Sequence, residues 1–91
     1  MFYVYILLSS KDSTFYVGQT NNLTNRLKKH NSGYVRSTRN KIPFKIVYFE
    51  EFQSRTEAMA REWEIKRKYN TERRRKLVLG FDVSKINELG L

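Results

Sequence analysis

The stretch that decides the fold is FYVYILLSSKDSTFYVGQT, residues 2–20. Residues 2–8 form a short run of aromatic, β-branched and other apolar side chains, which predicts a buried strand rather than a helix. Residues 9–13 have the composition of a turn, and residues 14–18 predict a second strand. The two strands are therefore expected to form a hairpin whose loop has about four or five residues.

An amphipathic helix follows the hairpin. Asn21 or Asn22 suits its start, because a short amide oxygen accepts a hydrogen bond from an otherwise unpaired backbone N–H. Gly33 suits a left-handed stop at its end. The residues that share one face at helical spacing are Leu23, Leu27 and His30, with Arg26 at the edge of that face.

The middle of the chain predicts one more strand and a second helix. A basic loop over residues 34–41 leads to a strand over residues 44–52, which begins with period-two alternation. Ser54 and Glu57 then fit a capping box, S-x-x-E, that opens a helix running to about Tyr69.

The whole order of elements predicts the fold class. A third helix over residues 72–79 is stopped by Gly80, so the order is β-β-α-β-α-α. This order predicts an α+β fold, in which helices flank a three-stranded antiparallel or mixed sheet. Residues 1–82 are expected to form a single domain, and residues 83–91 a short tail with one helical turn after Ser84.

Composition and charge indicate the class of partner. The chain has 91 residues, with 18 Lys and Arg against 9 Asp and Glu and a net charge of +9. Such an excess attracts polyanions, so nucleic acid is the expected partner. No cysteine is present, which excludes a disulfide framework and a thiolate metal site. No apolar run approaches the roughly 20 residues of a membrane span, and a cytoplasmic monomer is expected.

Basic residues of the 34–41 loop and the last two helices are expected to contact the nucleic-acid backbone, which positions a strand without reading its sequence. A run of charges is also commonly just a solvated face. The expected contacts are Arg36, Thr38, Arg39, Lys41, Lys66, Arg67, Arg73 and Arg74.

The two tyrosine-bearing strands bring two phenols together. If the hairpin turns around Lys11, the numbers of paired residues sum to about 21 or 22, so that Tyr5 lies opposite or diagonal to Tyr16. Alternation puts both rings on one face of the sheet, beside Gly18, where a second group can approach closely. Ordinary strand tyrosines with hydroxyls at the edge of the core give the same pattern, so these two residues alone leave both interpretations open.

The second helix carries an acidic residue on its apolar stripe. At about 100° per residue, Glu62 falls among Ala58 and Ile65, whereas Glu64 points nearly the opposite way. A carboxylate in that position is costly unless it is paired or binds a cation. The alternative to a bound metal is a structural ion pair, with Arg26 or with Lys66.

Taken together, these segments resemble the GIY-YIG nuclease family. Tyr3-Val4-Tyr5, ten residues, then Tyr16-Val17-Gly18 resembles the family signature, with Tyr3 in place of the first glycine and valine in place of both isoleucines. The resemblance covers about Tyr3 to Leu79 and is closest to small stand-alone bacterial members. Two later stretches also resemble the family's helix patterns: Gln19-Thr20-Asn21-Asn22-Leu23-x-x-Arg26-Leu27-x-x-His30-Asn31-x-Gly33 and Glu57-Ala58-x-x-x-Glu62-x-x-Ile65-Lys66.

The resemblance implies an endonuclease that hydrolyses phosphodiester bonds with one Mg²⁺ or Mn²⁺ ion. By position, Tyr5 and Tyr16 match the two motif tyrosines, Arg26 the catalytic arginine and Glu62 the single metal-binding carboxylate. His30 matches a position that is often histidine and can exchange a proton near neutral pH. Tyr16 is favoured for activating the water and Tyr5 for orienting it, although the reverse assignment stays open.

Three functions remain open at the level of sequence. The first is a DNA endonuclease, acting on branched or damaged substrates in repair or recombination. The second is a non-catalytic nucleic-acid binder that keeps the fold, since Tyr3 adds bulk where the family pattern is small. The third is a module that recruits a partner protein, and that partner would supply the specificity.

Overall fold

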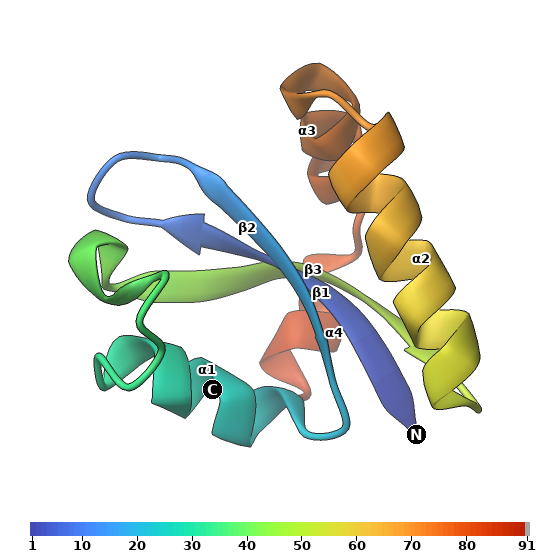
Figure 1. Ribbon diagram of the computed structural model, residues 1–91, viewed down its shortest axis with the longest axis horizontal. Coiled ribbons are helices and arrows are strands. Elements are labelled where there is room, and N and C mark those ends of the chain that lie inside the picture. The colour runs from blue at the N-terminus through green and yellow to red at the C-terminus, as the bar shows by residue number, and fades with distance from the viewer. Residues whose placement is uncertain (91) are drawn as a thin grey trace.

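The computed structural model describes residues 1–90 and confirms the predicted order of elements, to which it adds a 3-10 helix before the third strand and a short helix after the third α-helix. All three strands are antiparallel, with the order β2-β1-β3 (Figure 1). The elements are β1 (Phe2–Ser9), β2 (Phe15–Thr20), α1 (Leu23–Asn31), the 3-10 helix η1 (Arg39–Lys41), β3 (Phe44–Phe52), α2 (Arg55–Lys68), α3 (Thr71–Leu79) and α4 (Val83–Asn87).

Helices cover both faces of the sheet. α2 and α3 pack on one face, and α1 and α4 on the other (Figure 1). β1 is the central strand, so its residues are buried on both sides in turn, and this explains why the run from residue 2 to residue 8 is apolar throughout instead of alternating with polar residues.

Two hydrophobic clusters fill the space between the layers. The first, under α2, contains Val4, Ile6, Val17, Tyr48, Ala58 and Ile65. The second, under α1, contains Tyr5, Leu7, Leu23, Phe44, Ile46 and Phe49. Successive β1 residues alternate between the two clusters, as the pleat requires. Tyr5 therefore lies on the α1 side of the sheet.

The hairpin register differs from the prediction. Tyr5 faces Gly18 across the β1–β2 pair and Tyr16 faces Leu7. The register predicted from a turn around Lys11 is wrong because the loop extends further: Thr14 lies outside β2 and Ser13 takes a left-handed conformation, with φ of 61°. Tyr16 is nevertheless diagonal to Tyr5, as one of the two predicted arrangements required.

The predicted helix ends are confirmed. The Asn22 side chain, and not that of Asn21, caps α1 by accepting a hydrogen bond from the backbone N–H of Asn25 at 3.0 Å. Gly33 follows α1 with φ of 81°, the left-handed conformation that glycine adopts without strain. Ser54 caps α2 through the backbone N–H of Glu57.

The segment after residue 82, which the sequence predicts as a tail, packs against the domain. α4 begins at Val83, and Ile86 and Leu89 contact the second cluster. Among residues 1–90, no helix combines the length and the apolar character needed to cross a membrane.

Candidate active site

The phenol ring of Tyr5 lies directly over Gly18. Tyr5 is 1% exposed, and a Cβ atom added at Gly18 would stand only 2.6 Å from Tyr5 Cζ. No side chain fits there without a shift of the ring. The close approach predicted at this glycine is therefore made by Tyr5 itself, and the glycine fixes the position of the phenol.

A chain of polar contacts continues from the Tyr5 hydroxyl. Arg26 Nε donates a hydrogen bond to Tyr5 Oη at 3.3 Å, and Tyr5 Oη lies 3.1 Å from His30 Nε2. His30 Nδ1 in turn lies 2.8 Å from Thr38 Oγ1. His30 is fully buried, with an exposed fraction of 0%, so both ring nitrogens depend on these partners.

Tyr16 completes this group from the edge strand β2. Its ring meets the His30 imidazole edge-on, with 5.0 Å between centroids, and its side chain is half-buried. The pKa of Arg26 is raised, mainly by its hydrogen bond to Tyr5 and in smaller part by Tyr16. Arg26 therefore interacts with both phenols.

Burial sets the protonation states of the two inner groups. Burial raises the pKa of Tyr5 to about 12, although the hydrogen bond from Arg26 acts in the opposite direction. Burial also lowers the pKa of His30 to about 4, and the positive charge of Arg26 adds to this effect. At neutral pH Tyr5 therefore keeps its proton and His30 is uncharged.

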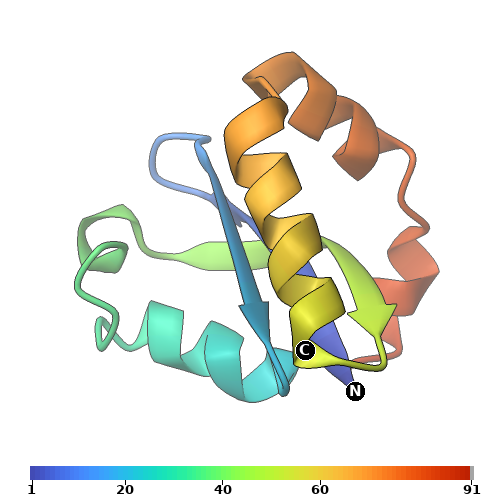
Figure 2. The same ribbon diagram turned by 45° about the vertical axis from the view of Figure 1, so that its right-hand side comes forward.

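Glu62 turns inward from α2, as the helical spacing predicts. α2 lies beside the edge strand β2 (Figure 2). The Glu62 side chain is 20% exposed, and its charge is among the smaller causes that raise the pKa of Tyr5. Glu64 instead pairs with Arg61.

The carboxylate of Glu62 forms an ion pair with a lysine one turn further along α2. Lys66 Nζ lies 3.0 Å from Glu62 Oε2 and 5.8 Å from the centroid of the Tyr16 ring. One of the two ion pairs considered as an alternative to a metal is therefore present. The Lys66 ammonium therefore lies near both the carboxylate and the Tyr16 phenol.

The residues at this position fit a divalent ion with mostly water ligands. Carboxylate oxygens are the donors that Mg²⁺ and Mn²⁺ prefer, and Mg²⁺ commonly keeps several waters. Within residues 1–90, no three His, Asp or Glu side chains gather into a metal site. An ion at this position would have Glu62 as its protein carboxylate ligand.

Two of the residues predicted to contact nucleic acid form hydrogen bonds with other parts of the protein instead. Thr38 is 1% exposed and its hydroxyl contacts His30, so the prediction that it contacts phosphate is wrong. The Arg74 guanidinium donates to the backbone carbonyls of Ile65 at 3.2 Å and Lys66 at 2.9 Å. Arg74 therefore satisfies carbonyl groups at the C-terminal end of α2, which have no partner inside the helix.

The other predicted contacts lie at the surface. Lys41 forms an ion pair with Asp12 at 3.4 Å, and the Arg73 guanidinium stacks on the Tyr69 ring at 3.9 Å. Lys66 forms an ion pair with Glu62, as described above. The three remaining residues, all exposed, are Arg36, Arg39 and Arg67.

Sequence reasoning missed the contact between Thr38 and His30. Thr38 lies in an irregular segment among charged residues, where no periodicity separates inward from outward positions. The composition of the loop predicts exposure for all its polar residues. Nothing in the local pattern distinguishes the one threonine that is buried.

The comparison with protein families agrees with this geometry. The model of the GIY-YIG catalytic domain matches residues 1–76. The chain belongs to the GIY-YIG family. Tyr5, Tyr16, Arg26, His30 and Glu62 all lie within the matched part of this GIY-YIG domain.

Relatives of this GIY-YIG protein are small proteins of similar length. A UPF0213 protein of Clostridium perfringens is 50% identical over 68 residues, which cover 74% of this chain and 72% of the relative. A UPF0213 protein of Haloquadratum walsbyi is 40% identical over 76 residues, covering 82% and 83%. The solution NMR structure of a UPF0213 protein from Bacillus halodurans is similar over 96% of this chain and 94% of that chain, with a TM-score of 0.55 and 35% identity.

Proposed function

We propose that this protein is a divalent-metal-dependent endonuclease that hydrolyses phosphodiester bonds, with DNA as its substrate. The observation that carries the proposal is the meeting of two phenols, a guanidinium and a buried imidazole beside an inward-facing carboxylate. They come from four elements, and the carboxylate is that of Glu62. Groups whose pKa values are shifted by burial and by a charged neighbour, as those of Tyr5 and His30 are, are concentrated at functional sites.

Arg26 is positioned to stabilise negative charge on the phosphate. Its Nε is held by Tyr5, which fixes the plane of the guanidinium, while the side chain stays half-buried at the surface. The remaining N–H donors match two phosphate oxygens in a fixed geometry. Donors that are oriented before the reaction stabilise the developing charge without reorganising.

The two tyrosines have different environments and so different roles. Tyr5 is buried, keeps its proton at neutral pH and hydrogen-bonds Arg26 and His30, so it positions these two groups. Tyr16 is half-buried at the sheet edge and lies under the Lys66 ammonium. Its hydroxyl is the phenol that can hydrogen-bond the attacking water and pass on a proton.

Glu62 is the residue that would hold the metal. An Mg²⁺ or Mn²⁺ ion held there would supply Lewis-acid chemistry, which polarises a phosphoryl group and stabilises a leaving oxygen. Lys66 balances the charge of this carboxylate through their ion pair. The other carboxylates of α2 are directed elsewhere: that of Glu57 accepts a hydrogen bond from the capping Ser54 hydroxyl, and that of Glu64 pairs with Arg61.

The substrate is held by exposed basic residues around this group. The net charge of +9 attracts the nucleic-acid backbone, and Arg36, Arg39 and Arg67 are exposed. Contacts of this kind fix a strand in place and carry little sequence information. We expect low sequence preference, a preference for branched or damaged DNA, and a monomer acting in the cytoplasm.

A cleavage assay tests the proposal. Supercoiled plasmid is incubated with Mg²⁺ or Mn²⁺ and the wild type, Glu62→Gln or Glu64→Gln. We expect nicking by the wild type and by Glu64→Gln, and its loss in Glu62→Gln, because only Glu62 faces the phenols. Equal nicking by all three proteins would show that another group carries the reaction. A panel of linear, nicked, flap and branched DNA then identifies the preferred substrate.

A non-catalytic nucleic-acid binder is the second candidate. The ion pair between Lys66 and Glu62 favours it, because a cationic side chain of the protein pairs with the carboxylate. The bulk of Tyr3, however, is accommodated in the second cluster, where its ring meets Phe49 edge-on at 6.2 Å between centroids. Salt-sensitive binding without cleavage, equal in the wild type and Glu62→Gln, would support the binder.

A further inference from the structure

Thr38 is a buried hydroxyl in an otherwise exposed segment. It is 1% exposed, whereas Ser37 and Arg39 on either side of it are exposed. Its Oγ1 lies 2.8 Å from His30 Nδ1 and 3.4 Å from the carbonyl oxygen of Val35. A buried hydroxyl is costly unless it is hydrogen-bonded, so these two contacts account for its position.

The ends of this polar chain determine the direction of every hydrogen bond in it. Arg26 Nε can only donate, so Tyr5 Oη accepts from it. The Tyr5 proton then has an acceptor in this chain if it is directed at His30 Nε2. At the other end the Val35 carbonyl can only accept, so the Thr38 proton is directed at it. Thr38 Oγ1 then accepts from His30 Nδ1. A single arrangement of protons satisfies all four side chains.

We propose that Thr38 is a positioning residue that holds His30 in the tautomer with the proton on Nδ1, so that Nε2 accepts the hydroxyl proton of Tyr5. The reverse tautomer would direct an N–H at the Tyr5 oxygen, which already accepts from Arg26. The Tyr5 proton would then lose its acceptor. This inference goes beyond the proposed nuclease function, and its importance for activity rests on that function.

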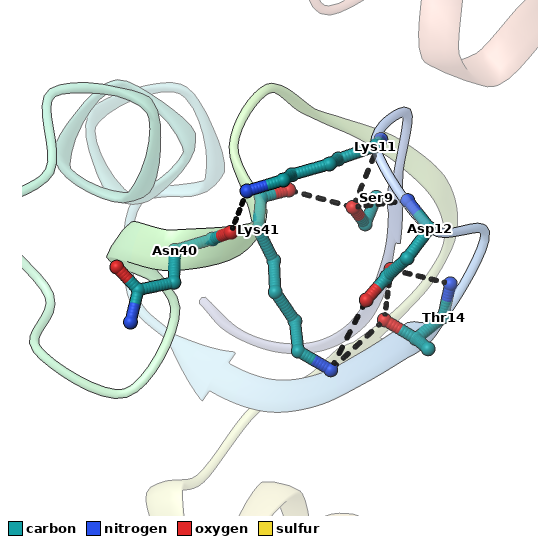
Figure 3. A network of polar contacts seen from close by, with 6 residues as sticks. All are labelled: Ser9, Lys11, Asp12, Thr14, Asn40 and Lys41. Atoms are coloured by element: carbon teal, nitrogen blue, oxygen red, sulfur yellow. Dashed lines mark hydrogen bonds and ion pairs between the residues drawn. The ribbon is translucent and has the colours of Figure 1, made fainter.

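Thr38 is held in place independently of its contact with His30. Figure 3 shows the network that ties the segment around η1 to the β1–β2 turn. Ser9 Oγ donates to the Lys41 carbonyl at 2.6 Å, and Lys11 Nζ donates to the Asn40 carbonyl at 3.0 Å. Lys41 Nζ pairs with Asp12 at 3.4 Å.

The chain on either side of this network is also fixed. At the end of α1 the Asn31 side chain hydrogen-bonds the backbone N–H of Phe44 at 2.6 Å and its carbonyl at 3.0 Å. The backbone N–H of Thr38 donates to the Val35 carbonyl at 3.1 Å. The loop therefore presents the Thr38 hydroxyl to His30 as a preformed acceptor, which is the arrangement expected of a residue that orients another.

Nitrogen NMR of the imidazole tests the assignment directly. His30 is the single histidine of the chain, so its two ring nitrogens are identified without ambiguity. At neutral pH we expect the wild type to carry a proton on Nδ1 and none on Nε2. A wild-type spectrum with the proton on Nε2 would overturn the proposal, and this reading needs no variant.

Two variants separate the hydroxyl from the shape of the side chain. Thr38→Val keeps the volume and removes the hydroxyl, and Thr38→Ser keeps the hydroxyl. We expect the Nε2-protonated form to become the major one in Thr38→Val and to stay minor in Thr38→Ser. An unchanged tautomer in a folded Thr38→Val protein would contradict the proposal.

Cleavage measurements connect the tautomer to activity. In the nuclease we expect kcat to fall about 10- to 100-fold in Thr38→Val, with recovery in Thr38→Ser and little change in KM. If Thr38 sets the tautomer but the wild type cleaves no DNA, the inference about Thr38 stands and the proposed function fails. If the wild type cleaves DNA and Thr38→Val keeps the wild-type tautomer, the inference fails and the function stands.

Discussion

At the scale of the residue, the site depends on close contacts between side chains and backbone that leave no space for a larger residue. Gly18 lies under the Tyr5 ring because every other residue would bring a Cβ atom against it. The backbone of Gly18 is not in a left-handed conformation, so the requirement is one of space. The position of the phenol therefore follows from the absence of one side chain on the neighbouring strand.

Substitution of this glycine should displace the phenol. In Gly18→Ala the new methyl group overlaps Tyr5, so we expect a loss of about 1–3 kcal/mol in the free energy of unfolding. Urea denaturation measures it. Gly80→Ala is the matched control, because a Cβ there meets its nearest atom at 3.4 Å. Equal stability of Gly18→Ala and Gly80→Ala would show that Tyr5 does not pack as described.

The buried imidazole makes stability depend on pH. The pKa of His30 is lowered from 6.5 to about 4 in the folded state, so between these values the unfolded chain binds more protons. Stability is therefore full above about pH 6.5 and falls as the pH falls towards 4. We expect a loss of about 2 kcal/mol between pH 7 and pH 5.

Replacement of the histidine checks the source of this dependence. In His30→Gln the titrating group is gone, so the free energy of unfolding should change much less between pH 7 and pH 5. Urea denaturation at the two pH values compares the variant with the wild type. A slope as steep as that of the wild type would assign the pH dependence to carboxylates instead.

At the scale of the element, most boundaries follow from local chemistry. Asn22, Gly33 and Ser54 end or begin their helices as the sequence predicts, because capping depends on the residue and its immediate neighbours. The hairpin register does not follow in the same way. It depends on the conformation of Ser13 and on contacts of the turn with residues near η1, which lie far away in the sequence.

The contacts of Arg74 at the C-terminal end of α2 can be tested by substitution. The Arg74 guanidinium binds two backbone carbonyls there, so in Arg74→Gln we expect the free energy of unfolding to fall by about 1–2 kcal/mol. Its neighbour Arg75 is exposed, and Arg75→Gln should change stability by less than about 0.5 kcal/mol. A larger effect of Arg75→Gln than of Arg74→Gln would contradict the assignment.

At the scale of the whole molecule, the fold class could be predicted in full and the site in part. Hydrophobic patterning and the order of elements predict the α+β fold, and helical spacing predicts that Glu62 faces inward. The tertiary partners of individual side chains could not be predicted. Thr38 and Arg74 contact residues on other elements, and only the assembled structure brings these together.

Charge is also distributed unevenly over the molecule. The inward-facing Glu62 lies near the phenols, whereas Glu50, Glu51 and Glu88 line a separate cavity together with Lys85. Glu50 also pairs with Arg61. Glu50 and Glu51 are therefore alternative carboxylates at which a divalent cation could bind. The proposed function requires that the divalent cation bind at Glu62.

Paramagnetic line broadening by Mn²⁺ tests this central claim most directly. Mn²⁺ is titrated into uniformly labelled protein, wild type and Glu62→Gln, and the broadening of signals is followed over residues 1–90. We predict that broadening in the wild type is centred on Glu62 and reaches Tyr16 and His30, and that it disappears in Glu62→Gln. Broadening centred on Glu50 and Glu51, or unchanged in Glu62→Gln, would contradict the account.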